Sequence, residues 1–237
     1  MWSGPRNIST AMMRSFGARA DCAVSDEPFY GAFLKETGEP HPMAAEIIDN
    51  MDCDWKRVLA TLSGDPPGGE PVWYQKHMPH HMEGPVHIEH MPHHRHAFLI
   101  RNPARMVASY RHKNELTGPE ALGYARMRRY FETEADRLGH APPVVDSDAI
   151  LTNPAGVLAK LCEALDIAWA PAMLSWKKGP LPEDGIWGPH WYDKVNASTG
   201  FGAPPGPVPE LSEYQQQVAD ACRADYAALA DHSIKAA

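Results

Sequence analysis

The sequence contains no run of about 18 apolar residues, the length that a membrane-spanning helix needs. It also has no basic segment followed by an apolar stretch at its start, which argues against a secretory signal. Four cysteines (Cys22, Cys53, Cys162 and Cys222) are widely scattered and include no CxxC pair. They indicate reduced thiols rather than a disulfide framework. We therefore expect a cytoplasmic protein with no membrane partner.

The chain also lacks an excess of positive charge, because its formal net charge is −8 with the histidines counted as neutral. Domains that bind nucleic acids usually carry a basic surface, so we expect no nucleic-acid partner. Arginines nevertheless gather in two stretches, Arg6–Arg19 and Arg95–Arg111. Local positive sites on an acidic chain favour a small anionic ligand, although any one of these arginines could equally lie on a solvated helix face.

Short apolar segments alternate with helical patterns along the 237 residues. Strands are expected at 22–24, 72–77, 97–100 and 144–145. Helices are expected at 9–19, 43–62, 104–111, 120–139, 154–165 and 211–229. This alternation predicts an α/β fold with a central parallel sheet covered by helices on both faces. We expect a single domain over residues 1–237, in which the segment 170–210, rich in Pro, Gly and Trp, is irregular and lies over the site.

A turn and two hydroxyl residues stand at the start of the chain, in Ser3–Thr10 (SGPRNIST). Gly4 predicts a tight turn, and Ser9 and Thr10 predict the start of a helix. A helix N-terminus after such a turn offers unpaired N–H groups and the positive end of the helix dipole to an anion. We therefore expect a phosphate-binding loop with Arg6 as its charge; a simple helix cap is the alternative.

This loop is not a Walker A motif, which reads GxxxxGK[ST], because the lysine is absent. Only Met1 and Trp2 precede the loop, although a phosphate loop normally follows a strand. We expect either an unusually short first strand or further residues upstream of Met1.

A second basic site is expected where the apolar segment Phe98–Ile100 ends in Arg101, Asn102 and Pro103. Ligands of open α/β sheets bind at the carboxyl ends of the strands, where this pattern places Arg101. Ser109 lies on the predicted helix that follows. A guanidinium matches the oxygens of a phosphate and a hydroxyl adds a donor, so we expect Arg101 and Ser109 to bind a phosphate.

Two motifs together resemble the sulfotransferases that use 3′-phosphoadenosine 5′-phosphosulfate (PAPS). The first is the Pro-Arg-x-x-Ser-Thr loop. The second is a strand that ends in Arg-Asn-Pro and is followed, after five more residues, by Ser. In that family the loop reads Pro-Lys-Ser-Gly-Thr-Thr and holds the 5′-phosphosulfate, while the second block holds the 3′-phosphate. Two further segments, Asp26–Phe29 and Val144–Pro154, are similar to family segments, whereas Arg6 and Ile8 replace a lysine and a glycine. The resemblance implies a three-layer α/β/α fold with P-loop nucleoside triphosphate hydrolase-like topology.

The resemblance also implies an activity: transfer of a sulfuryl group from PAPS, as co-substrate, to a hydroxyl or amine of a small-molecule acceptor, with no metal required. It implies that the donor is bound by Pro5, Arg6, Asn7, Ile8, Ser9, Thr10, Arg101 and Ser109. Sulfuryl transfer resembles phosphoryl transfer, in which the protein mainly positions the reactants and stabilises charge. Arg6 can supply that charge but not a proton.

The acceptor must lose a proton to a base. The segment Gln75–Pro79 (QKHMP) resembles the Lys-Thr-His-Leu-Pro segment of the cytosolic members, whose histidine is the base, so the resemblance implies His77. Glu27, in the segment that is similar to carbohydrate-type members, is the second candidate; a loop or helix cap is its alternative role. Four residues of the C-terminal region are candidates for either the acceptor pocket or the core: Trp187, His190, Trp191 and Tyr192.

Three other functions fit parts of the sequence. Residues 77–96 hold eight of the thirteen histidines, and imidazole is a common zinc ligand, but Pro79, Pro85 and Pro92 interrupt the helices that would pair them. A kinase-like phosphotransferase should contain the Walker lysine that the loop lacks. A nucleotide-binding protein without catalysis would bind 3′-phosphoadenosine 5′-phosphate (PAP) and leave every acceptor unsulfated.

Overall fold

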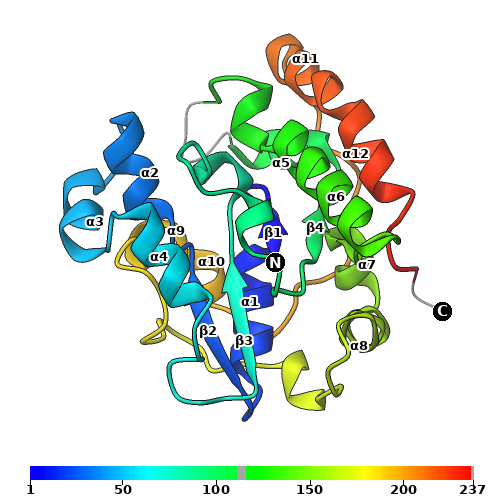
Figure 1. Ribbon diagram of the computed structural model, residues 1–237. Helices are drawn as coiled ribbons and strands as arrows, with labels where there is room; N and C mark the ends of the chain where they lie inside the picture. The colour runs from blue at the N-terminus through cyan, green and yellow to red at the C-terminus, as the bar shows by residue number, and fades with distance from the viewer. Residues whose placement is uncertain (111–115, 236–237) are drawn as a thin grey trace.

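The computed structural model describes residues 1–110 and 116–235, and shows a parallel sheet flanked by helices (Figure 1). The strands are β1 (Trp2–Ser3), β2 (Cys22–Asp26), β3 (Val72–Lys76), β4 (Phe98–Ile100) and β5 (Val144–Asp146). β1, β4 and β5 form one sheet with β4 in the middle, and β2 pairs with β3 in another. All these pairs are parallel. An isolated parallel bridge between Trp2 and His77 joins the two sheets, so the strand order is β2-β3-β1-β4-β5.

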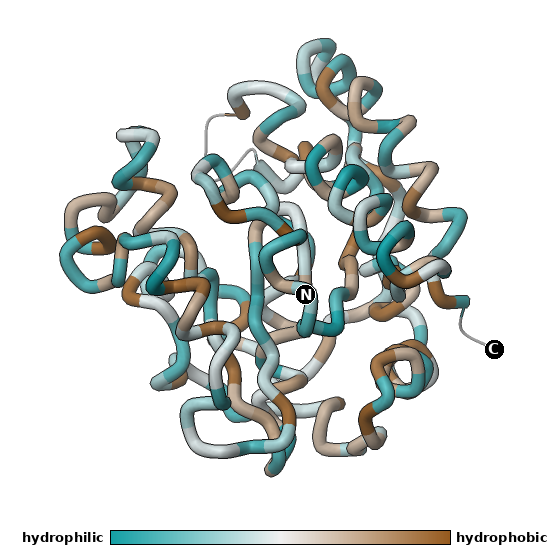
Figure 2. The backbone as a smooth tube through the Cα atoms, viewed as in Figure 1, coloured by the Kyte–Doolittle hydropathy of each residue, from teal (hydrophilic) through white to brown (hydrophobic). Residues whose placement is uncertain are grey.

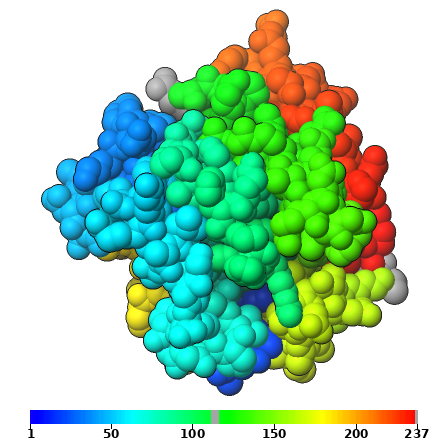
Figure 3. Space-filling model, in the orientation of Figure 1, coloured from blue at the N-terminus to red at the C-terminus, as the bar shows by residue number. Residues whose placement is uncertain are grey.

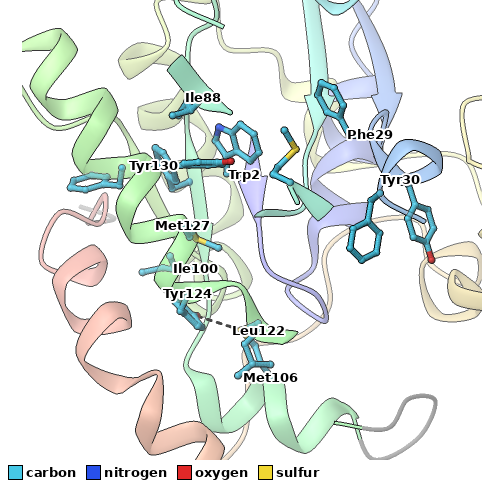
Figure 4. Close-up of a cluster of buried hydrophobic side chains, with 14 of the residues drawn as sticks. Trp2, Phe29, Tyr30, Ile88, Ile100, Met106, Leu122, Tyr124, Met127 and Tyr130 are labelled. Atoms are coloured by element: carbon cyan, nitrogen blue, oxygen red, sulfur yellow. Dashed lines mark hydrogen bonds between the residues drawn. The ribbon is translucent and has the colours of Figure 1, made fainter. Parts of the chain in front are cut away.

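The sheet is buried on both faces, because neighbouring residues of β4 belong to two different hydrophobic clusters. Phe98 and Ile100 pack in one cluster with Trp2, and Leu99 packs in the other. Figure 4 shows part of the first cluster, in which Tyr130 lies against Trp2 with ring centroids 4.9 Å apart. A sheet covered in this way needs a helical layer on each face. The predicted three-layer α/β/α fold with a parallel sheet is therefore confirmed.

The helices in chain order are α1 (Ser9–Gly17), α2 (Tyr30–Thr37), α3 (Ala44–Asn50), α4 (Trp55–Leu62), α5 (Pro103–Tyr110), α6 (Tyr124–Leu138), α7 (Ser147–Thr152), α8 (Pro154–Ala164), α9 (Gly188–Trp191), α10 (Asp193–Asn196), α11 (Glu213–Ala221) and α12 (Arg223–Ala230). Four short 3-10 helices are η1 (Pro79–His81), η2 (Ile88–His90), η3 (Pro119–Leu122) and η4 (Pro171–Leu174). Helices α1 and α8 contribute to the cluster around Leu99, and α6 and α12 to the cluster around Phe98. Hydrophobic and hydrophilic residues alternate along the outer helices, as the tube in Figure 2 shows.

The helices differ from the sequence prediction mainly in their ends. The helix predicted over 43–62 is divided into α3 and α4, because the Asp54 side chain accepts hydrogen bonds from two backbone N–H groups and starts α4. The helix predicted over 120–139 is divided at Gly123, which adopts a left-handed φ of 72° between η3 and α6. The closing helix is divided into α11 and α12, and α2, α7, α9 and α10 were not predicted; α9 and α10 lie within 170–210, which was expected to be irregular. Arg111, the last residue of another predicted helix, lies outside the described residues.

The start of the chain is enclosed by later segments. Only a few dark-blue atoms of the first residues are visible in the space-filling view (Figure 3), and Trp2 and Ser3 are fully buried. The Met1 amino group donates a hydrogen bond to the Gln75 carbonyl oxygen, 2.9 Å away. No helix in the described ranges is both long and apolar enough to cross a membrane.

Candidate active site

A cleft of about 480 Å³ is built from the segments that follow the carboxyl ends of β1, β2, β3 and β4. In a parallel sheet these ends share one edge, so residues far apart in the chain meet there. The loop after β1 lines the cleft, together with Glu27, Lys76 and Arg101. Residues of the segment 187–203 complete the wall, so the Pro-, Gly- and Trp-rich region lies at the site.

The loop between β1 and α1 turns sharply, because Arg6 and Ile8 adopt left-handed φ angles of 58° and 43°. Such angles are uncommon for residues other than glycine and are strained for a β-branched one, so the surrounding structure must hold the loop in place. Part of that restraint lies at Gly4, where a Cβ would stand 2.6 Å from the Leu122 carbonyl oxygen. All the loop residues predicted to bind the donor, Pro5 to Thr10, line the cleft.

Asn7 ties the loop to the sheet. Its buried side chain donates a hydrogen bond from Nδ2 to the carbonyl oxygen of Leu99 on β4, over 2.6 Å. The Asn7 Oδ1 atom is buried and has no hydrogen-bond partner within the described ranges. The amide therefore fixes the loop with one atom and leaves a buried acceptor at the cleft.

The second predicted block meets the loop directly. The Arg6 guanidinium donates a hydrogen bond from Nε to the Ser109 hydroxyl, over 3.0 Å. Arg101 donates from Nη1 to the Arg6 carbonyl oxygen, over 2.7 Å, and all three residues line the cleft. Burial lowers the pKa of Arg101, and the positive charges of Arg105 and Arg6 lower it further. The negative charge of Asp148 acts in the opposite direction but does not cancel these effects. Two guanidinium groups are thus held close together at one site, where an anion would relieve their mutual repulsion.

One wall of the cleft contains a buried lysine between two carboxylates. Lys76 Nζ lies 2.8 Å from Asp26 Oδ1 and 2.7 Å from Glu27 Oε1, and the lysine side chain is 1% exposed. Burial lowers the pKa of Lys76, but the two carboxylates outweigh burial and hold it well above its usual value. The ammonium therefore stays charged. It also reaches the Thr10 hydroxyl at the start of α1, 3.3 Å away.

Glu27 itself has a strained backbone, with a left-handed φ of 44°. Its backbone N–H donates a hydrogen bond to the Lys76 carbonyl oxygen over 3.1 Å. This bond holds Glu27 in the strained conformation at the point where β2 ends beside β3. Strained residues of this kind gather at functional sites, and the Glu27 side chain lines the cleft.

The C-terminal segment is attached to this wall by Tyr192. The Tyr192 hydroxyl donates to Asp26 Oδ2 over 2.5 Å and accepts from Lys76 Nζ over 2.8 Å. A second attachment is the ion pair between Arg14 on α1 and Asp184, with N and O 2.6 Å apart and both side chains buried. Trp187, Trp191 and Tyr192 line the cleft, as one of the two predicted roles requires. His190 is not among the lining residues.

The structure does not bring His77 to the cleft. Successive side chains of β3 alternate between the faces of the sheet, and Lys76 takes the cleft face. His77 instead stacks on Trp2, with ring centroids 4.7 Å apart, and its Nε2 lies 3.3 Å from Gln75 Oε1. It lines a separate cavity of about 670 Å³ that shares no residue with the cleft. The expectation that His77 is the base therefore conflicts with its position.

The histidines of residues 77–96 are distributed over several surroundings. His80 and His81 line the cleft, whereas His96 accepts a hydrogen bond at Nδ1 from the Trp2 indole and donates one from Nε2 to the Met91 carbonyl oxygen. No group of three or more His, Cys, Asp or Glu side chains that could hold a metal ion is found in residues 1–110 and 116–235.

Several cleft residues were not predicted as site residues, and two of them matter for the chemistry. Lys76 and His81 both line the cleft, and each lies close to Glu27. Alternation along the predicted strand 72–77 could have placed Lys76 and His77 on opposite faces. The position of His81 depends on the turn of η1, for which the sequence offered no signal except Pro79 at its start.

The chain is similar to several known proteins. The Sulfotransferase domain family matches residues 1–231. Two proteins of Arabidopsis thaliana, branched-chain-amino-acid aminotransferase-like proteins 2 and 1, are each 36% identical to the chain, over 203 and 204 residues. These matches cover 86% of this chain and 36% of each relative, so the chain spans about a third of the length of these relatives.

Two solved structures are also similar. The sulfotransferase domain from the curacin biosynthetic pathway is 12% identical with a TM-score of 0.44, and the match covers 94% of this chain and 95% of that one. The sulfotransferase domain from the Synechococcus PCC 7002 olefin synthase is 16% identical with a TM-score of 0.46, covering 93% and 92%. Because the family match extends over nearly the whole chain, the protein belongs to the sulfotransferase domain family.

Proposed function

We propose that the protein transfers the sulfuryl group of PAPS to a hydroxyl or amine of a small-molecule acceptor. The observation that carries this proposal is the contact between the two basic blocks: Arg6 bonds to Ser109, and Arg101 bonds to the carbonyl oxygen of Arg6. A donor with a phosphosulfate at one end and a phosphate at the other requires two anion sites on one cleft. The family supports sulfotransferase activity, while the donor and the acceptor are our inference.

The residues divide into two groups in this proposal. The loop residues Pro5, Arg6, Asn7, Ile8, Ser9 and Thr10 hold the 5′-phosphosulfate, and Arg101 with Ser109 holds the 3′-phosphate. Arg6 stabilises the charge that develops as the bond between sulfur and the bridging oxygen breaks. Arginine remains protonated, so the PAP product leaves with charge stabilisation alone.

In this proposal, the acceptor loses its proton at the wall of the cleft that contains Lys76 and Glu27. Of the two predicted bases, Glu27 lines the cleft and His77 does not. The acceptor lies, in this proposal, between the loop and the aromatic residues Tyr30, Trp187 and Trp191, which line the same cleft. The cytoplasm is the compartment that we propose for this reaction, because all four cysteines are free.

A thermal-shift comparison of PAP, PAPS, ATP and GTP tests the donor. A ligand that binds only the folded state raises the melting temperature in proportion to the logarithm of its concentration over its dissociation constant. We expect PAP and PAPS to stabilise the protein and ATP and GTP to have little effect. Stabilisation by ATP without stabilisation by PAP would overturn the proposal and favour a kinase-like activity. Binding of PAP without transfer to any acceptor would identify a nucleotide-binding protein without catalysis.

A further inference from the structure

The cleft is lined by His41, His80 and His81, of which His81 lies beside Glu27. His81 ends η1, which follows β3, and Glu27 follows β2, so the pairing of β2 with β3 brings the two residues together. His81 Nδ1 lies 3.6 Å from Glu27 Oε2, and both side chains line the cleft. Such contacts are often long without substrate and shorten in the reacting complex.

The His81 ring is held between two aromatic rings of α2. It stacks on Tyr30 with centroids 4.4 Å apart and parallel planes, and on Phe33 with centroids 4.8 Å apart. Helix α2 begins three residues after Glu27, so one short segment supplies both the carboxylate and the walls that fix the ring. The plane of the imidazole is therefore set before any acceptor binds.

The charge state of His81 suits a proton acceptor. Burial lowers the pKa of His81 well below its usual value, and His41 and Lys76 lower it further. The ring is therefore neutral at physiological pH. With Nδ1 turned toward a carboxylate, the neutral tautomer that carries its proton on Nδ1 leaves the lone pair on Nε2. His81 Nε2 makes no hydrogen bond to any residue in 1–110 or 116–235.

Glu27 is poorly suited to take the proton itself. Its Oε1 atom is already engaged in an ion pair with the Lys76 ammonium, 2.7 Å away. Its Oε2 atom is the one that faces His81. A carboxylate held by a cation on one side and facing an imidazole on the other can orient that imidazole and stabilise its protonated form.

We propose that His81 is the catalytic base and that Glu27 is the residue that positions it, an inference that rests on the proposed sulfuryl transfer. The acceptor hydroxyl gives its proton to His81 Nε2 while its oxygen forms a bond to sulfur. The bond from sulfur to the bridging oxygen breaks, and PAP leaves with that electron pair. The imidazolium then returns its proton to water. No part of this step needs His77.

The test compares two acceptors that differ in their need for a base. para-Nitrophenol is largely ionised at mildly alkaline pH, whereas benzyl alcohol must lose its proton during transfer. His81→Gln should lower the rate with benzyl alcohol about 10²- to 10⁴-fold, the range typical of general-base removal, and the rate with para-nitrophenol less than about tenfold. Glu27→Gln should show the same selective loss. Rates are measured as transfer of radiolabelled sulfate from PAPS to the acceptor. If the wild-type protein does not use benzyl alcohol, water takes its place as the acceptor that must lose a proton, and the release of free sulfate is measured.

Several controls separate this inference from the proposed function. Calorimetry should show that PAP binds the wild-type protein, His81→Gln and the control His140→Gln, an exposed site, with equal affinity. Failure of the wild-type protein to bind PAP would overturn the proposed function itself. Three outcomes would overturn the assignment of the base. The first is an equal loss of rate with both acceptors in His81→Gln, and the second is no loss of rate in that variant. The third is a selective loss of rate with benzyl alcohol in His77→Gln but not in His81→Gln. His81→Gly should regain turnover when imidazole is added, which a purely structural role for His81 would not allow.

Discussion

Arg6 donates a hydrogen bond from Nε to the Ser109 hydroxyl over 3.0 Å, although 103 positions separate these residues in the chain. The bond fixes the direction of a guanidinium on a loop whose backbone is strained at the same residue. The two residues belong to different halves of the proposed donor site. If the donor binds as proposed, we expect this contact to couple the binding of one end of the donor to the position of the charge at the other.

We predict that the effects of Arg6→Ala and Ser109→Ala on PAP affinity are not additive. Loss of Ser109 releases the Arg6 side chain, so part of the cost of each substitution is shared. Calorimetric titration of both single variants and the double variant should give a coupling energy of about 0.5 to 3 kcal/mol, as for other residues in direct contact. Effects that add within error would contradict a functional link between the two halves.

Arg101→Ala should weaken PAP binding by roughly 10- to 100-fold, because a hydrogen bond to a charged group contributes about 1.5 to 3 kcal/mol. If Arg101 binds the 3′-phosphate, the affinity for adenosine 5′-phosphate, which lacks that group, should change far less. Arg128→Ala, at a half-exposed arginine that pairs with Glu132, is the control and should bind both nucleotides normally. An equal loss for both nucleotides would place Arg101 elsewhere in the site.

Local patterns in the sequence were sufficient to predict where several residues of the candidate cleft lie. A buried strand followed by Arg101 places that residue at the carboxyl edge of a parallel sheet, and the structure has it there. The loop residues Pro5–Thr10 also line the cleft, because the turn and the start of α1 are encoded in eight consecutive residues. The fold followed in the same way from four short apolar segments separated by helical patterns.

The positions that could not be predicted depend on contacts between distant segments. Resemblance to a family motif implied His77, but the pleat of β3 gives the cleft face to Lys76 and stacks His77 on Trp2. Similarly, no local pattern announces that Tyr192 bonds to Asp26, 166 positions earlier. A motif can indicate which segment reaches a site, whereas the orientation of each side chain is decided by the packing around it.

Gly4→Ala should impair the donor site without touching any proposed ligand contact. A Cβ at this position would lie 2.6 Å from the Leu122 carbonyl oxygen and 2.8 Å from Met106 Cε, closer than such atoms approach in real structures. The backbone oxygen cannot move freely, so the loop must shift. We expect weaker PAP binding, because displacement of a binding group by about 1 Å has a large effect at a preorganised site. Gly206→Ala, where nothing lies within 4 Å, is the matched control and should bind PAP normally in the same calorimetric titration.

Lys76→Met should lower the free energy of unfolding by about 3 to 5 kcal/mol, because it leaves the buried carboxylates of Asp26 and Glu27 without their cation. Denaturation with urea at neutral pH measures the loss. The double variant Lys76→Met with Asp26→Asn removes one of the uncompensated charges and should regain part of the stability. Unchanged stability in Lys76→Met would mean that the carboxylates are protonated or hydrated, contrary to the ion pairs described.

Acid should destabilise the protein from about pH 6.5 downward, before ordinary carboxyl groups titrate. Burial lowers the pKa of His96 from 6.5 to about 3, and burial also lowers the pKa values of His77, His80 and His81 well below 6.5. Between the two pKa values of such a group the unfolded chain binds a proton that the folded protein excludes. Stability therefore falls as the pH decreases, by about 1.4 kcal/mol per pH unit for each histidine.

His96→Gln isolates one of these groups. The Gln side chain does not titrate, so the unfolded variant binds about one proton fewer than the unfolded wild-type protein. Between about pH 6.5 and about pH 5, the free energy of unfolding should therefore fall less steeply, by about 1.4 kcal/mol per pH unit. Its stability at neutral pH should be lower than that of the wild-type protein, because His96 bonds to the Trp2 indole and to the Met91 carbonyl. Urea denaturation at several pH values gives both quantities. A slope identical to that of the wild-type protein would show that His96 already holds its proton in the folded state, since only a histidine that is neutral when folded and charged when unfolded can produce the difference.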